Sequence, residues 1–318
     1  MMKIKLLLTA LFLANLVLMV GMSSCKRKCK GSAMGCEERL IISFKPVENI
    51  DYTEVYRRMK NGLSFNKYGY QLEPQWKLKF VSADSARIYS PIKKQFINFP
   101  LTRGYDSIFN TARTWYKVRK MSRDSLVLEI LKFQGDSIDV SGNQVFMTFY
   151  ANDYIKKLHT DSATLRRPSR RDTLFVKQLV AKANTNPDSA FAARQPVVLT
   201  TKSPLVKIEQ RHTEPSLMNN FDSSDDYLDP EFYITINKAY KDFNYSFTVK
   251  VDTAGKMTYG IPLIAFQEED YKKSYLRLSE AVMNTYLKYY LQVTPGSTLG
   301  MPHTSVISLH VKGIAAKK

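Results

Sequence analysis

The chain has 318 residues, 44% of them hydrophobic and 12% aromatic, which excludes wholesale disorder and is enough for two domains of ordinary size. Lys and Arg number 47 and Asp and Glu number 29, so the net charge of +18 favours anionic partners such as lipid headgroups or acidic protein surfaces. Only three cysteines occur, all before residue 37, so the rest of the chain must fold without disulfides.

The first thirty residues have the pattern of an export signal. Two lysines precede an uncharged, Leu-rich run over 6–22, and two serines and Cys25 follow it. A short basic region, an apolar core and small residues are typical of an address segment and not of a folding unit. The box from Met22 to Cys25 resembles the signal of bacterial lipoproteins, whose cysteine is diacylated and becomes the new N-terminus. The resemblance implies a signal peptide over 1–24 and a lipid on Cys25, with a simple cleaved signal or an uncleaved anchor as alternatives.

The segment 25–37 is predicted to be a basic tether. Four Lys and Arg residues between 26 and 30 would lie against anionic headgroups, each adding about 1 kcal/mol of membrane binding. An oxidising compartment permits a disulfide between Cys29 and Cys36, and metal ligation is the alternative, although no His lies nearby. We therefore expect a lipoprotein of a Gram-negative cell envelope that faces the periplasm, with the outer membrane favoured over the inner.

Residues 38–155 are predicted to form a β-rich domain with one helix. A short strand is expected over 38–46. Asp51 and Glu54 have the spacing of a capping box, and the apolar residues that follow recur at helical intervals. This pattern predicts an amphipathic helix over 52–61 that Gly62 ends.

From residue 75 the hydrophobic period changes to two, the period of half-buried strands. Turn residues separate successive alternating runs. The expected strands cover 76–81, 86–89, 114–118, 126–133 and 145–150. We expect a mainly antiparallel domain, for which a lipocalin-like barrel and a sandwich fit the spacing equally.

Residues 156–230 are predicted to be an irregular connecting region, after a helical turn over 153–159. Four arginines around Pro168 indicate an exposed linker, with a docking patch for an anionic partner as the alternative. A short helix over 174–183 and strands over 197–199 and 205–209 are expected. The carboxylates of 222–229 would attract calcium, but the EF-hand order and its Gly are missing, which favours a solvated loop.

The last hundred residues alternate most regularly. They predict strands over 231–237, 245–251, 257–263 and 304–311 and an amphipathic helix over 268–291. Gly255 supplies the positive φ of a tight hairpin turn. Pro295 and Gly296 are expected to end the helix.

The order strand, strand, turn, strand, helix, loop, strand resembles the C-terminal domain of the TonB family. The similarity rests on the run from Phe247 to Met257, the Pro295-Gly296 pair, the Gly300-Met-Pro302 box and the final strand. Two residues separate Asp252 from Gly255, and no Trp precedes Pro295, which departs from the family pattern. The resemblance implies an α+β domain over 231–312 that pairs one sheet edge with an extended peptide. The implied edge residues are Thr304, Val306, Ile307, Leu309 and Val311.

No catalytic constellation accompanies these elements. The four histidines are far apart and lack metal-ligand spacing, and no Gly-rich phosphate loop, nucleophile elbow or HExxH helix occurs. We expect an α+β, non-enzymatic, lipid-anchored envelope protein without a cofactor, metal or nucleic-acid partner. The resemblance implies a TonB-dependent transporter as its partner. The alternatives are a carrier that encloses an apolar ligand in the N-terminal β domain and an inner-membrane energy transducer with an uncleaved N-terminal helix.

Overall fold

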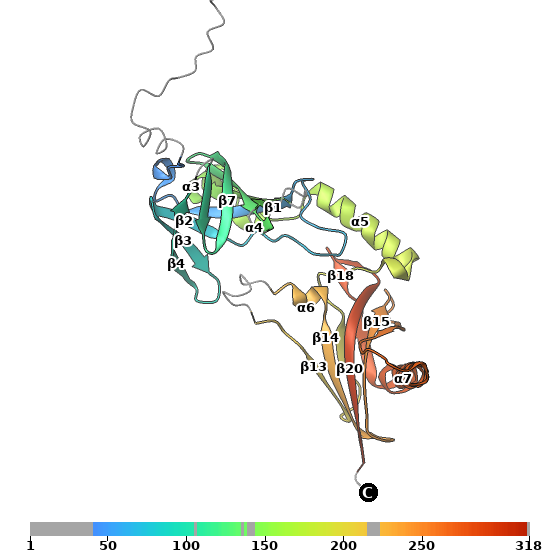
Figure 1. The fold of residues 1–318 in the computed structure, drawn as a ribbon. Helices are drawn as coiled ribbons and strands as arrows, with labels where there is room; N and C mark the ends of the chain where they lie inside the picture. The colour runs from blue at the N-terminus through green and yellow to red at the C-terminus, as the bar shows by residue number, and fades with distance from the viewer. Residues whose placement is uncertain (1–40, 105–106, 135–136, 139–143, 215–222, 317–318) are drawn as a thin grey trace, which may run out of the picture.

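The computed structural model describes residues 41–104, 107–134, 137–138, 144–214 and 223–316 (Figure 1). The predicted signal peptide and tether lie outside the described residues. So do the expected lipid site at Cys25, the expected disulfide between Cys29 and Cys36, and the start of the strand expected over 38–46.

A nine-stranded antiparallel sheet forms the N-terminal part of the structure. Strands that follow one another in the chain are neighbours in the sheet, except for the fourth and the fifth, and the last strand returns to pair with the first. In chain order the strands are β1 (Tyr52–Met59), β2 (Lys77–Ser82), β3 (Ser85–Ser90), β4 (Gln95–Pro100), β5 (Thr102–Arg103), β6 (Ile108–Thr111), β7 (Thr114–Met121), β8 (Ser125–Leu131) and β11 (Val145–Ala151). A separate two-stranded hairpin of β9 (Phe133–Gln134) and β10 (Ser137–Ile138) lies between β8 and β11 in the chain.

This sheet is nearly closed. Its two edges are β4 and β5, and only Leu101 separates these strands in the chain. The Oγ1 hydroxyl of Thr111 on β6 donates to the carbonyl oxygen of Pro100 on β4 at 3.1 Å, which links the two edges. The enclosed side is filled by aromatic rings, with the centroids of Phe44 and Phe80 stacked 4.1 Å apart. The nearly closed sheet matches the barrel-like alternative and not the two-layer sandwich.

The helix predicted over 52–61 is wrong, because these residues form β1. The first four side chains of this strand are all buried, so its two faces lack the contrast that marks a half-exposed strand in sequence. Glu54 does not act in a capping box, since its buried carboxylate bonds to Arg57 and to two backbone N–H groups of the next segment. Residues 41–46 do not form the expected strand either, and a 3₁₀ turn, η2 (Lys45–Val47), begins there.

The other strands predicted in the N-terminal half are confirmed as β2, β3, β7, β8 and β11, whereas β4 and β6 were not predicted. The expected helical turn is α3 (Asn152–Lys157).

The arginine-rich stretch around Pro168 is exposed at Arg167, Arg170 and Arg171, as predicted, but it is a short connection between two helices and not a long linker. It joins α4 (Ser162–Leu165) to the 16-residue α5 (Arg170–Thr185), which contains the shorter helix predicted over 174–183. Ser169 caps α5: its hydroxyl accepts from the backbone N–H of Asp172, and the Asp172 carboxylate accepts from the N–H of Ser169 at 2.9 Å. Asp172 also accepts from the N–H of Ser64 at 2.7 Å, so α5 is fixed to the segment after β1.

A five-stranded mixed sheet forms the C-terminal part, in the order β13-β14-β20-β15-β16. The central pair β14 and β20 is parallel, and the remaining pairs are antiparallel. The strands are β13 (Val206–Gln210), β14 (Glu231–Ala239), β15 (Phe243–Val251), β16 (Met257–Pro262) and β20 (Ser305–Ala315). The expected strands of this region are therefore confirmed.

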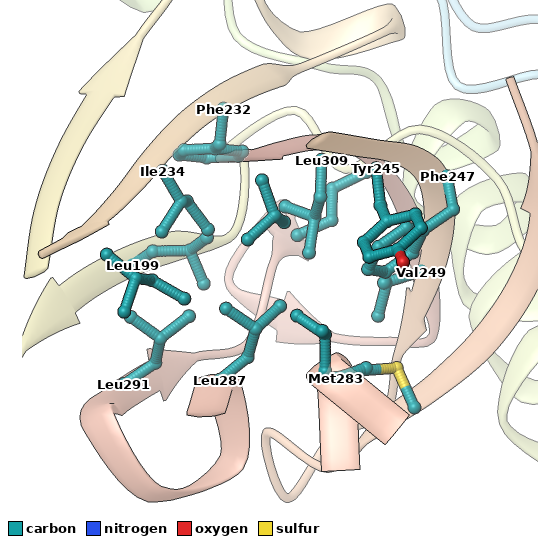
Figure 2. Packing of buried hydrophobic residues seen from close by; sticks show 14 of the residues in the cluster. Leu199, Phe232, Ile234, Tyr245, Phe247, Val249, Met283, Leu287, Leu291 and Leu309 are labelled. Carbon is teal, nitrogen blue, oxygen red and sulfur yellow. The ribbon is translucent and has the colours of Figure 1, made fainter. Parts of the chain in front are cut away.

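One helical segment packs on this sheet. It consists of α7 (Glu269–Val282), a π turn η4 (Met283–Leu287) and α8 (Lys288–Tyr290). Figure 2 shows Met283 and Leu287 facing Phe247, Val249 and Leu309 of the sheet across a continuous apolar core. Pro295 and Gly296 do not end the helix, because β17 (Leu291–Thr294) intervenes and pairs with β12 (Val198–Thr201).

The region 156–230 therefore contains α4, α5, η3 (Pro187–Ser189), β12, β13 and α6 (Asp225–Leu228). It also connects the two sheets in space. Arg194 pairs with Glu73 and lies over the ring of Tyr227 at 4.5 Å. The N–H of Gln71 donates to the Tyr227 hydroxyl at 3.1 Å.

Candidate functional site

The prediction that 304–311 offers a free sheet edge is wrong. These residues lie in or just before β20, the central strand, which pairs with β14 on one side and β15 on the other. The sequence contains no local sign of this arrangement, because paired residues of β14 and β20, such as Glu231 and Ser308, are far apart in the chain. The residues expected at the edge are buried or half-buried: Thr304, Val306, Ile307, Leu309 and Val311.

The predicted turn glycines have distinct roles. Gly255 has a φ of 76° in a turn where its N–H donates to the carbonyl oxygen of Asp252 at 3.0 Å, as expected. Gly300 also has a positive φ, 75°, between β18 (Ser297–Thr298) and β19 (Met301–Pro302). Gly296 allows the backbone to lie close to Ala193, since a Cβ at position 296 would lie 2.5 Å from the Cβ of Ala193. The half-buried Pro295 precedes it.

The two actual edges of the C-terminal sheet are β13 and β16, and they differ in charge. β13 carries Lys207 and Glu209, which form an exposed ion pair. Charged residues of this kind discourage the addition of another strand. β16 contains no charged residue, and the uncharged run continues to residue 267. Among the described residues, no strand pairs with the outer side of β16.

Apolar side chains continue from this edge to the surface. Ile261 is 65% exposed, Leu263 41% and Ile264 36%. We call β16 together with Leu263 and Ile264 the β16 edge. An exposed apolar group beside an uncharged strand edge has the two features that a bound strand requires, backbone pairing and side-chain contact.

The β16 edge is held firmly on its inner side. The N–H of Ile261 donates to Thr248 Oγ1 at 2.9 Å, and the N–H of Leu263 donates to the carbonyl oxygen of Ser246 at 2.9 Å. A Cβ at Gly260 would lie 2.3 Å from Thr248 Oγ1, so only glycine allows this approach. Sequence reasoning missed this edge, and the signal that could have found it is the uncharged run over 257–267.

The face of the sheet away from the helix carries a polar network. Ser246 Oγ lies 2.9 Å from His310 Nδ1, and His310 Nε2 lies 4.0 Å from a carboxylate oxygen of Glu231. The ring of Tyr233 stacks on His310 with centroids 4.6 Å apart. Partial burial opposes ionisation of Glu231, but hydrogen bonds from Arg211 and Tyr233 outweigh it and lower the pKa of this carboxyl.

This serine, histidine and glutamate do not have the geometry of an acyl-transfer site. A catalytic base must itself be oriented by hydrogen bonding, and the 4.0 Å separation of His310 from Glu231 is too long for that. An oxyanion also needs preorganised donors. The backbone N–H of Ser246 itself donates to the hydroxyl of Tyr275 at 2.7 Å. The network therefore ties neighbouring strands together.

His303 forms a second, buried polar junction. Its ring stacks on Phe191 with centroids 3.8 Å apart. Nδ1 lies 3.1 Å from the carbonyl oxygen of Thr304 and must donate to it, so Nε2 accepts from the hydroxyl of Thr298 at 3.0 Å. Burial lowers the pKa of His303, and the hydrogen bond to Thr304 opposes this effect only in part. The neutral imidazole thus joins the segment before β12 to the β18–β19 hairpin.

Two further properties concern the described ranges only. They contain no group of three His, Cys, Asp or Glu side chains arranged to hold a metal ion. None of the helices in these ranges combines the length and apolar content needed to cross a bilayer.

No protein-family model matches this chain, and no curated protein matches it.

Proposed function

We propose that this protein is a non-enzymatic, lipid-anchored component of the cell envelope that binds an extended peptide segment of an envelope partner at the β16 edge. The observation that carries the proposal is an uncharged edge strand whose outer side has no partner among the described residues, with Ile261, Leu263 and Ile264 exposed beside it.

The binding mode follows from the chemistry of strand edges. An edge strand presents backbone N–H and C=O groups that an extended peptide can pair with, and alternate side chains then determine specificity. β13 is the poorer acceptor because of Lys207 and Glu209. The TonB-like order of elements over 231–312 supports a peptide of a TonB-dependent transporter as the bound segment. In this chain that segment would add to β16, because β14 covers the outer side of β20.

Site-specific photo-crosslinking in intact envelopes tests this proposal. A photoreactive residue at the exposed Thr258 on β16 should crosslink to an outer-membrane transporter, and one at Glu209 on β13 should not. Ile261→Lys should reduce the Thr258 crosslink at least tenfold. Val198→Lys is the matched control, because Val198 is 52% exposed on another strand. Crosslinking that is equal at both edges, or unaffected by Ile261→Lys, would contradict the proposal.

The anchor is tested separately by the intact mass of the purified membrane form. A diacylglyceryl-modified N-terminal Cys25 is expected, and Cys25→Ala should release the protein or leave it unprocessed. An intact Met1 would instead favour the energy transducer with an uncleaved helix.

The interior of the nearly closed sheet is filled by side chains, which argues against the carrier alternative. Phe44, Phe80, Phe109 and Tyr116 inside the nearly closed sheet are each at most 1% exposed. Their edge and stacking contacts form one continuous aromatic cluster. A large apolar ligand would have to displace these rings, which favours the peptide-binding function.

A further inference from the structure

Four segments of the chain meet at one end of the C-terminal sheet. The N–H of Asn237, in β14, donates to the carbonyl oxygen of Leu205 at 2.8 Å, which joins the turn after β14 to the turn before β13. The N–H of Lys202 donates to the carbonyl oxygen of Tyr290 on α8, also at 2.8 Å. β20 runs parallel to β14 and ends beside it. We call this end the tip, and it comprises residues 202–205, 237–243, 286–290 and 312–316.

Tyrosine rings cover one side of the tip. The N–H of Tyr240 donates to the hydroxyl of Tyr286 at 3.0 Å, and the two rings stack with centroids 6.5 Å apart. Tyr290 stacks on Tyr286 at 6.1 Å and meets the edge of Tyr289 at 5.1 Å. The two outer rings are open to solvent, since Tyr289 is 76% exposed and Tyr240 is 59% exposed. The tip therefore presents an aromatic surface whose rings are held in place by one another.

The charges around these rings are almost all positive. The tip contains one acidic residue, Asp242, whose carboxylate accepts from the backbone N–H of Ala315 at 2.7 Å. The Nζ atom of Lys241 lies 5.4 Å from the centre of the Tyr240 ring. The other lysines of the tip are exposed as well, and none of the five forms an ion pair with a described residue. They are Lys202, Lys238, Lys241, Lys288 and Lys312.

Exposed tyrosine together with lysine suits the surface of a membrane. Aromatic rings of this kind settle at the level of the lipid headgroups, and lysine side chains reach anionic headgroups from there. We propose that the tip binds an anionic phospholipid surface, with Tyr240 and Tyr289 among the headgroups and the lysines on their negative charges. An acidic protein would also pair with the lysines, but it would need a matching cavity for the protruding rings. A headgroup layer accommodates the rings without one.

This contact is separate from the anchor expected at Cys25 and from the β16 edge. Figure 1 shows β20 ending on the side of the molecule that points away from the nine-stranded sheet. Phe44 and Val47, near the start of the described chain, pack into the core of that nine-stranded sheet. The protein would thus touch lipid at both ends.

Vesicle flotation with the full-length protein tests the inference. The purified membrane form would be held in phosphatidylcholine nanodiscs, so that its own anchor is occupied, and mixed with separate vesicles. Vesicles of phosphatidylglycerol and phosphatidylcholine in equal parts should carry the nanodiscs upward in a density gradient. Vesicles of phosphatidylcholine alone should not, because they have no net charge. Added salt should release the bound nanodiscs, and nanodiscs without the protein should not float.

Lysine variants separate the tip from the rest of the basic surface. Removing three charges from the tip should weaken binding to the anionic vesicles about tenfold or more. This variant combines Lys238→Gln, Lys241→Gln and Lys288→Gln. A matched control removes three exposed charges elsewhere and should retain binding. It combines Lys93→Gln, Lys94→Gln and Lys177→Gln.

Tyrosine variants separate a lipid surface from an acidic protein. Tyr240→Ser combined with Tyr289→Ser keeps every charge but should weaken vesicle binding about tenfold, since two rings no longer enter the headgroup layer. Tyr271→Ser, at a ring 54% exposed on α7, should not. Thermal unfolding of each variant checks that the fold persists. No flotation, equal losses in the two lysine variants, or full binding without the two tyrosines would each overturn the inference, the last in favour of an acidic polypeptide. None of these variants changes β16, so the proposed function is tested independently.

Discussion

The sequence pattern predicted Glu54 in the capping box of a helix, whereas the structure buries it in a strand. Its carboxylate is fully buried and accepts two hydrogen bonds from Arg57 at 2.7 Å. It also accepts from the N–H groups of Gln75 and Trp76, each at 2.9 Å. Arg166 donates to the carbonyl oxygen of the same residue. The carboxylate of Glu54 thus fixes β1 to the segment before β2, and its backbone carbonyl binds the residue that follows α4.

Glu54→Gln should destabilise the protein by about 3 kcal/mol, because it leaves the guanidinium of Arg57 without its buried counter-charge. Urea unfolding measures this loss. Glu209→Gln is the matched control: its ion pair with Lys207 is exposed, so the change should cost less than about 1 kcal/mol. Equal losses for the two variants would show that the buried pair does not stabilise the fold.

His303 predicts a pH dependence of stability. Because burial holds its folded pKa below the unfolded value of 6.5, the unfolded chain takes up a proton first as the pH falls. The stabilising contribution of neutral His303 is therefore complete above pH 6.5 and is lost progressively below it. His303→Gln should remove this part of the pH dependence, measured as unfolding free energy between pH 7.5 and 5.5. The exposed His159→Gln should leave it unchanged.

At the scale of elements, sequence patterns succeed where one face of an element is buried and the other exposed. β2 and β15 alternate in this way, and both were predicted. β1 has buried residues on both faces, and its spacing imitates a helix. β6 was missed because its sequence, Ile-Phe-Asn-Thr, does not alternate between apolar and polar residues.

The start of α5 is determined locally, and its capping residues give an element-scale prediction. Ser169→Ala should cost about 1 kcal/mol, since one N-cap hydrogen bond is lost. Asp172→Ala should cost more, because it also leaves the buried N–H of Ser64 without its partner. Chemical denaturation of both variants compares these losses. A larger loss of stability for Ser169→Ala than for Asp172→Ala would contradict the interpretation that Asp172 fixes α5 to the loop after β1.

At the scale of the whole molecule, the sequence pattern does not predict which strands pair when they are far apart in the chain. The turn at Gly255 is encoded locally and was predicted, as were the strands on either side of it. The position of β20 was not, because it depends on β14, and the two are not neighbours in the chain. The sequence therefore predicted a peptide-binding edge on the final strand, whereas the uncharged edge of the folded sheet is β16.

Arg194 connects the two sheets through Glu73 and Tyr227. Arg194→Ala should weaken this connection by about 1 kcal/mol while leaving both cores intact. Amide hydrogen exchange at Gln71, whose N–H bonds to Tyr227, should become faster. Arg211→Ala, which removes an exposed ion pair within one sheet, should not change exchange there. Unchanged exchange at Gln71 in Arg194→Ala would mean that other contacts hold the two sheets together.

The pairing of β1 with β11 has a consequence for the order of folding. Thr53 and Asn152, which bond at 2.7 Å where these two strands meet, are 99 positions apart in the chain. Local hairpins such as β2–β3 and β7–β8 can form without β11, whereas β1 and β8 each keep one unpaired edge until β11 lies between them. Pairing across such a distance is slow relative to local hairpin formation. We therefore expect the insertion of β11 to be a late step of folding, before which both edges are open to pairing with other chains.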